Sequence, residues 1–201
     1  VGFSGREEDG CDPGNVWFHN LHMTYAWALA LAARGKKAVS VLDYGGGLGH
    51  YFEISKALLP GVEFDFHIKE VPALVEAGKD LYPKIHWHTD NQCLERAYDF
   101  IVASSCLQYI EQWDETLQKI CHATGGYFLL TRLPVVEHNS FLMIQWILGS
   151  EMLAWALNKT AVLTKIEQTG LRLIREVLPG ESAKLPGAPE EWIHRGWLFA
   201  K

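Results

Sequence analysis

The stretch VSVLDYGGGLGHYF, residues 39–52, constrains the fold of this chain more than any other segment. It begins with six mostly apolar or β-branched residues, which predict a strand buried on both faces of a sheet. Glycines at 45, 46, 47 and 49 follow, and the segment HYFEISKALLPG then predicts a helix that Pro60 and Gly61 end. A strand, glycine loop and helix of this kind place bare backbone at the carboxyl end of a sheet, where ligands bind in open α/β folds.

Strand and helix patterns alternate through the rest of the chain. Strands are predicted at 62–69, 84–88, 98–104 and 127–133, with helices at 72–82 and 112–123 between them. This alternation predicts an α/β fold: a doubly wound, mostly parallel seven-stranded sheet with helices on both faces. The runs LRLIREVL and EWIHRGWLFAK have no helical pattern between them, so we expect them to form a C-terminal antiparallel β-hairpin.

The domain organisation follows from the same pattern. We expect one domain overall, with an N-terminal segment and helix over 1–38 and a Rossmann-like part over 39–201. A helix is expected from Asn20 to Ala33. The apolar segment at about 135–159 is too long for a plain connection, so we expect a helical insertion that covers the ligand site or faces a partner, a second copy of the chain included.

Composition excludes several classes of function. The formal net charge of −6 provides no basic surface for nucleic acid, and the most apolar segment is interrupted by polar residues and falls short of a membrane span. Residues 1–10 lack the charged and apolar regions of a signal peptide, so we expect a cytoplasmic protein. The four cysteines form no paired motif and fit reduced thiols: Cys11, Cys93, Cys106 and Cys121.

The glycine loop fits the dinucleotide fingerprint G-x-G-x-x-G poorly. Counted from Gly45 and Gly47, the third glycine would fall on His50. Asp43 at the strand end would also repel a pyrophosphate, whereas it would attract an ammonium or sulfonium group. A cationic nucleoside therefore fits the loop better than NAD does.

The segment VLDYGGGLG resembles the first motif of Rossmann-like (class I) S-adenosylmethionine-dependent methyltransferases. The match continues through EVPALVEAGK, SSCLQYI, LLTRLPV and WALNKTAVLTKIEQTGL. Together these segments are similar to a bacterial family of methyltransferases of unknown substrate, over roughly 39–201. The resemblance implies S-adenosyl-L-methionine as cofactor, with Glu70 accepting the ribose hydroxyls and Asp90 facing the adenine. The residues expected to bind the cofactor are Asp43, Gly45, Gly46, Gly47, Gly49, Glu70, Val71, Asp90, Asn91, Ser104 and Ser105.

The acceptor half of the site leaves a weaker pattern in the sequence. A sulfonium methyl group is already activated, so few catalytic side chains are required. The candidates for a general base or a substrate contact are His22, Tyr25, Tyr109, Arg132 and His138. His19 and His22 lack a carboxylate or cysteine partner, and no metal site is expected in the chain.

Three functions remain open from the sequence. The first is methyl transfer from S-adenosyl-L-methionine to a small molecule or glycan precursor. The others are a non-catalytic binding or assembly subunit with the same fold and an NAD(P)-dependent oxidoreductase, and Asp43 argues against the latter.

Overall fold

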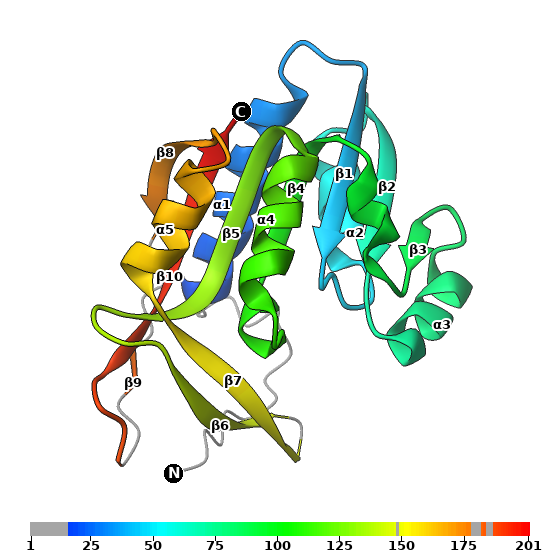
Figure 1. The fold of residues 1–201 in the computed structure, drawn as a ribbon. Coiled ribbons are helices and arrows are strands. Elements are labelled where there is room, and N and C mark those ends of the chain that lie inside the picture. Colours follow the sequence, from blue (N-terminus) through cyan, green and yellow to red (C-terminus); the bar gives the residue numbers. More distant parts are fainter. Residues whose placement is uncertain (1–15, 148, 178–181, 184–186) are drawn as a thin grey trace.

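The computed structural model describes residues 16–147, 149–177, 182–183 and 187–201 (Figure 1). Cys11 and the rest of residues 1–15 lie outside the described residues, while the other three cysteines are free thiols. Within the described ranges, no helix is long and apolar enough to cross a membrane.

Helices and strands alternate as the sequence predicts. The helical elements are α1 (Val16–Ala33), α2 (His50–Leu58), α3 (Pro72–Leu81), η1 (Asn91–Glu95), η2 (Leu107–Tyr109), α4 (Trp113–Ala123) and α5 (Lys159–Glu167). The strands are β1 (Ala38–Tyr44), β2 (Glu63–Lys69), β3 (His86–His88), β4 (Tyr98–Ser104), β5 (Thr124–Val136), β6 (Phe141–Ile147), β7 (Ser150–Asn158), β8 (Arg172–Val177), β9 (Ser182–Ala183) and β10 (Trp192–Ala200).

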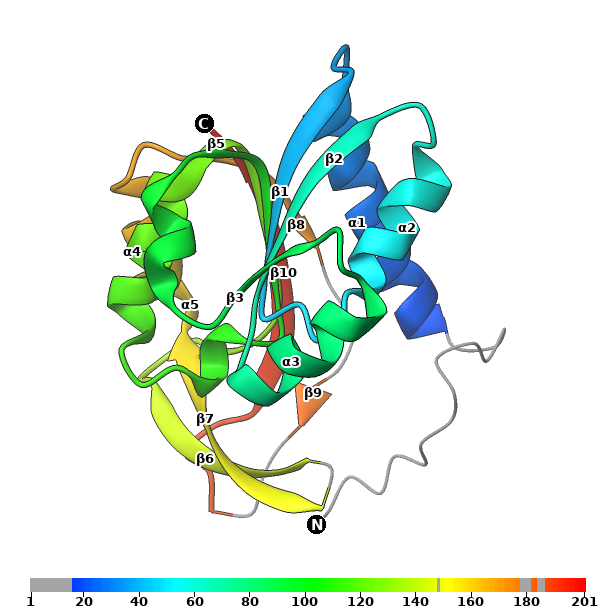
Figure 2. The ribbon, with the colours of Figure 1, turned by 90° about the vertical axis from the view of Figure 1, so that its right-hand side faces the viewer.

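The main sheet has the strand order β3-β2-β1-β4-β5-β10-β8. Neighbours from β3 to β5 pair in parallel, and β10 runs antiparallel to both β5 and β8. Figure 2 shows α1 and α2 on one face of the sheet and α4 and α5 on the other. The predicted fold class and the antiparallel C-terminal strands are confirmed.

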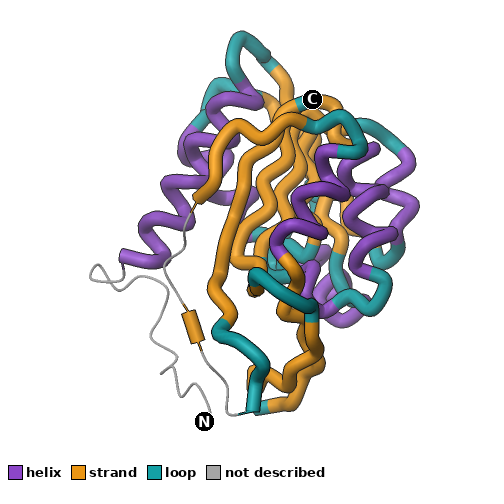
Figure 3. The backbone as a smooth tube through the Cα atoms, turned by 60° about the vertical axis from the view of Figure 1, so that its left-hand side comes forward, coloured by secondary structure: helices purple, strands orange, loops and turns teal. Residues whose placement is uncertain are grey.

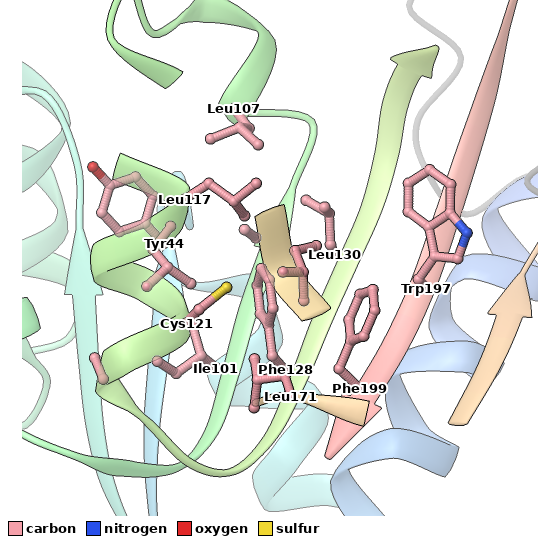
Figure 4. Packing of buried hydrophobic residues seen from close by; sticks show 14 of the residues in the cluster. Tyr44, Ile101, Leu107, Leu117, Cys121, Phe128, Leu130, Leu171, Trp197 and Phe199 are labelled. Atoms are coloured by element: carbon pink, nitrogen blue, oxygen red, sulfur yellow. The ribbon is translucent and has the colours of Figure 1, made fainter. Parts of the chain in front are cut away.

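Each central strand supplies both halves of the core, because successive side chains point to opposite faces. In β1, Val39 and Val41 pack under α1 and α2, whereas Leu42 and Tyr44 pack in the cluster under α4 and α5. Figure 4 shows part of that second cluster, with Phe128 and Leu130 between the α4 side chains and Trp197. Burial on both faces explains why the strand reads as a continuous apolar run.

The expected helical insertion at 135–159 is wrong. Strand β5 continues to Val136, and β6 and β7 then form an antiparallel hairpin that projects from the end of the sheet (Figure 3). Burial alternates along β6: Leu142 and Ile144 are exposed and Met143 between them is buried. Since apolar residues occupy both faces, this alternation is invisible in the sequence. The first helix also begins earlier than expected, at Val16 instead of Asn20.

Asp99 ties together the amino ends of β1 and β4. Its Oδ1 accepts a hydrogen bond from Lys36 Nζ at 2.7 Å, and its Oδ2 accepts from the Ser40 amide at 2.8 Å and the Ser40 hydroxyl at 3.0 Å. Partial burial alone would raise the pKa of Asp99, but the Lys36 ammonium and the Ser40 donors outweigh it and hold the pKa below its ordinary value. The carboxylate therefore stabilises the fold.

Asp99→Asn is expected to lower the free energy of unfolding by about 1 kcal/mol at neutral pH, through loss of charge-assisted hydrogen bonds. Because the folded pKa is lowered, this stabilisation is present above the unfolded pKa and is lost as pH falls through the folded value. Urea unfolding measures the free energy of unfolding at neutral pH and near pH 3. The difference in this free energy between variant and wild type should shrink in acid. Asp80→Asn, at an exposed carboxylate of α3, is the control; equal losses in the two variants would contradict the prediction.

Candidate functional site

The glycine loop between β1 and α2 is pressed against the protein on one side and open on the other. A Cβ on Gly45 would lie 2.4 Å from Cys106 Cβ, and a Cβ on Gly46 would lie 2.5 Å from Asp43 Cγ. A Cβ on Gly47 would meet nothing within 4 Å, although its φ of +57° still favours glycine. The loop thus offers bare backbone to the space outside the sheet.

Asp43, the penultimate residue of β1, lies directly behind this loop. It is 1% exposed, and neither of its carboxylate oxygens accepts a hydrogen bond from the described residues. Burial, and secondarily the Glu70 carboxylate, raises the pKa of Asp43 to about 8. A buried carboxyl group without a donor either keeps its proton or needs a cationic partner. The residues here therefore fit a cofactor that carries positive charge.

Glu70 follows β2 and reaches across to the same loop. Its Oε1 accepts from the Gly47 amide at 3.2 Å, and its Oε2 accepts from the Val71 amide at 2.6 Å. Each carboxylate oxygen has a second lone pair, so both can accept a further hydrogen bond from a ligand. The Val71 side chain beside it is 53% exposed.

Asp90 and Asn91 follow β3 at the carboxyl end of the sheet, and both form hydrogen bonds with nearby residues. Asp90 Oδ1 caps η1 by accepting from the Gln92 amide at 2.9 Å, and Asn91 Oδ1 accepts from the Tyr44 hydroxyl at 2.7 Å. These bonds order the turn. Contact of either residue with the cofactor stays a prediction.

Backbone strain occurs directly after β4 and at the point within β5 where its pairing with β4 ends. In the described part of the chain, the two non-glycine residues with positive φ are Ser105 at 56° and Arg132 at 58°. The Ser105 amide donates to the carbonyl of Thr131, the residue before Arg132, at 3.0 Å, so the two strained positions are neighbours. Such strain gathers at functional sites, and here it borders the predicted cofactor loop. Ser104, the last residue of β4, has a buried hydroxyl close to Tyr51.

The acceptor candidates do not form one cluster. Tyr25 is fully buried, stacks on Tyr51 with ring centroids 4.0 Å apart and contacts the Ser55 hydroxyl at 2.7 Å, so it belongs to the core and not to a pocket. His138 is largely exposed in the turn after β5 and pairs with Glu190. The burial of Tyr25 and the exposure of His138 depend on tertiary packing, which a sequence pattern does not reveal.

The charge of Arg132 acts on a second group of side chains. Burial lowers the pKa of His50 and of His194 to about 4 in each case; the His22 ring and then the Arg132 charge add to the effect on His50, and the Arg132 charge adds to the effect on His194. The His50 ring also lies 6.0 Å from that of His22. Neither His50 nor His194 belongs to a sequence motif, although the position of His50 directly after the glycine loop is a usable signal.

Tyr109 lies on η2, after β4. Its hydroxyl donates to Gln145 Oε1 in the β6–β7 hairpin at 2.9 Å. The Arg132 charge is also close enough to affect the Tyr109 pKa, although burial is the larger effect and raises it. Tyr109 therefore links the hairpin to η2, which follows the end of β4.

The comparisons with known proteins agree with this arrangement. Residues 17–174 match the family model described as a methyltransferase domain. No curated protein matches the sequence.

Solved methyltransferase structures share the fold. A Listeria monocytogenes protein provisionally assigned as an S-adenosylmethionine-dependent methyltransferase aligns with a TM-score of 0.64 and 14% identity, over 91% of this chain and 97% of the other. Magnesium protoporphyrin IX methyltransferase from Synechocystis PCC 6803, with bound S-adenosylmethionine, aligns with a TM-score of 0.58 and 12% identity. The alignment covers 92% of this chain and 81% of the other. An N-methyltransferase from Bradyrhizobium japonicum, in complex with S-adenosylhomocysteine, aligns with a TM-score of 0.55 and 15% identity. The alignment covers 94% of this chain and 89% of the other.

We expect Glu70→Ala to weaken binding of S-adenosylhomocysteine by about 1.5 to 3 kcal/mol, because charge-assisted bonds to the ligand and the support of the Gly47 amide are both lost. Isothermal titration calorimetry measures the change. Glu63→Ala, at the opposite end of the same strand, is the matched control and should bind normally. Unchanged affinity in folded Glu70→Ala would remove Glu70 from the site.

Asp43→Asn should have opposite effects on stability and binding. The folded carboxyl group has a raised pKa, so the ligand-free wild type loses stability as pH rises from the unfolded value towards about 8. Above that pH the variant should melt a few degrees higher, while it binds S-adenosylhomocysteine more weakly for lack of a negative charge. Thermal melts and calorimetry test the two halves, and a variant less stable than wild type at every pH would show that Asp43 is ionised and satisfied.

Proposed function

Because the chain belongs to the family of S-adenosylmethionine-dependent methyltransferase domains, we propose that it methylates a small molecule, a glycan precursor included. The observation that carries the proposal is the open backbone at Gly47 with the buried, unpaired carboxyl group of Asp43 close behind the loop. Bound S-adenosylmethionine supplies a methyl group already activated by the sulfonium charge. The chain itself has to bind, orient and desolvate the acceptor.

The carboxyl ends of four parallel strands supply the cofactor side of the site. In this proposal the carboxylates of Asp43 and Glu70 bind the charged and hydroxylated parts of the cofactor, and the glycines let it approach the backbone. The residues assigned to it are Asp43, Gly45, Gly46, Gly47, Gly49, Glu70, Val71, Asp90, Asn91, Ser104 and Ser105. Their assignment rests on strand-end position and on the contacts described above.

The acceptor side has a different chemical character. Arg132 supplies positive charge, while the rings of His50 and His194 are neutral at pH 7 because their pKa values lie near 4. The positive charge of Arg132 favours an acceptor that carries a carboxylate or phosphate group near the atom to be methylated. The neutral rings can donate or accept a hydrogen bond without adding charge.

The β6–β7 hairpin takes the place of the helical cover expected from the sequence. Its connection through Gln145 and Tyr109 puts it beside the end of β4, and Met143 packs it against Trp192 of β10. We assign the hairpin to the rim of the acceptor site, where it limits access of water during transfer. This assignment rests on position.

Turnover by wild type and an Arg132→Ala variant tests the proposal. Both proteins are incubated with S-adenosyl-L-methionine labelled in the methyl group and a panel of small molecules, with matched acidic and neutral members. We expect labelled product from acidic acceptors, a fall in kcat/KM of at least about tenfold in Arg132→Ala, and unchanged affinity for S-adenosylhomocysteine. Arg175→Ala, at an exposed arginine of β8, is the control and should behave as wild type.

The outcomes separate the competing functions. Binding of S-adenosylhomocysteine without turnover of any acceptor would favour a non-catalytic binding subunit. Stabilisation by NAD and not by S-adenosylhomocysteine in thermal melts would favour an oxidoreductase. Equal turnover by Arg132→Ala and wild type would leave the methyltransferase in place and remove Arg132 from the acceptor site.

A further inference from the structure

Two short sequence patterns place four metal-ligand side chains on one face of the sheet edge. Strand β2 contains Asp65 and His67 two residues apart, and β3 contains His86 and His88 with the same spacing. Residues two apart on a strand share a face, and the parallel pairing puts His67 directly opposite His86. Asp65, His67 and His86 consequently gather their ligand atoms within 4.8 Å of one another.

The distances suit a tetrahedral ion. Asp65 Oδ1 lies 3.0 Å from His67 Nε2 and 3.5 Å from His86 Nε2. Ligands at 2.0 to 2.2 Å from a tetrahedral zinc ion are about 3.4 Å apart. His67 is buried at the base of the cluster, whereas the side chains of Asp65 and His86 are 41% and 61% exposed, so an ion can enter from solvent and His86 can rotate towards it.

The hydrogen bonds around His67 Nε2 favour one tautomer of the ring. His67 Nε2 lies 3.0 Å from the acceptor Asp65 Oδ1 and also 3.0 Å from the donor Arg96 Nη1. A single ring nitrogen either carries a proton or presents a lone pair, so it cannot satisfy both neighbours. With the lone pair on Nε2, the proton sits on Nδ1 and is donated to His88 Nε2 at 2.9 Å. That tautomer is the one in which His67 binds a metal, and His88 then holds the ring in place.

We propose that Asp65, His67 and His86 bind a zinc ion, with a water molecule as fourth ligand. Oxygen and imidazole ligands in this number are typical of zinc sites with an open position. Arg96 competes for the cluster, because its Nη2 donates to Asp65 Oδ2 at 2.8 Å. The guanidinium group has to move aside when the metal enters.

The proposed site is separate from the cofactor loop but connected to it. Asp65 precedes Glu70 by five residues on β2, or about 17 Å along an extended strand. Strand β3 is three residues long and forms the edge of the sheet, and the carbonyl of His88 accepts from the Glu70 amide at 3.0 Å. A zinc ion that joins β3 to β2 would therefore stiffen the strand pair from which Glu70 extends.

Titration of the untagged protein with Zn²⁺, followed by calorimetry and by elemental analysis after dialysis, tests the proposal. We expect one ion per chain, a raised Tm, and a loss of affinity of at least about tenfold in Asp65→Asn and in His86→Ala. Arg96→Ala should bind zinc more tightly than wild type, because a competing cation is removed. His122→Ala, at an exposed histidine of α4 that contacts its own helix through the Gln118 carbonyl, is the matched control.

Co²⁺ gives a second readout, because the intensity of its visible absorption distinguishes tetrahedral from octahedral coordination. A tetrahedral spectrum that disappears in His86→Ala and persists in His122→Ala supports the site. The proposal is overturned if neither wild type nor Arg96→Ala binds zinc, or if zinc binds equally to wild type, Asp65→Asn and His86→Ala. The second result would mean adventitious binding elsewhere on the chain.

Discussion

The burial of β1 between two parallel neighbours and two helical layers is the constraint on which the rest of the structure depends. Val41 and Leu42 point into opposite halves of the core, so neither face of the strand can turn to solvent. Parallel pairing then sets Asp43 opposite Ile68 of β2 and Val102 of β4. Strands distant in sequence consequently end side by side at the carboxyl end of the sheet, where the candidate site lies.

The same packing sustains unfavourable features at that edge. Asp43 is desolvated without a donor from the described residues, and Ser105 and Arg132 hold left-handed backbone conformations. Each feature costs free energy that a ligand-free loop would relieve by rearranging, but the packed sheet beneath prevents this. A cationic cofactor and a desolvated acceptor are the partners that such an edge suits. The chemistry proposed for the chain is thus tied to the rigidity of its sheet.

Strand β2 connects the two sites considered above. Its alternation sends Phe66 and Ile68 into the core and leaves Asp65 and His67 on the other face, where β3 adds two histidines. The residue after the strand, Glu70, reaches the glycine loop. One register therefore determines both the cofactor carboxylate and the histidine cluster.

Local patterns were sufficient for the main architecture: the apolar strand, the glycine loop, the alternation with helices and the antiparallel C-terminal strands depend on neighbours in sequence. The positions of Asp43 and Glu70 at strand ends followed from the same reasoning, and their contact with the cofactor remains a prediction. The sequence of residues 135–159 does not distinguish a helix from strands, because an apolar segment satisfies a helical period and a strand period alike. Pairing of Val135 with Leu157 and packing against Trp192 stabilise the strands in the folded chain. Only the tertiary structure could bury Tyr25, bring His50 and His194 to Arg132, and set His67 beside His86, because these contacts join segments whose spacing along the chain carries no periodic signal.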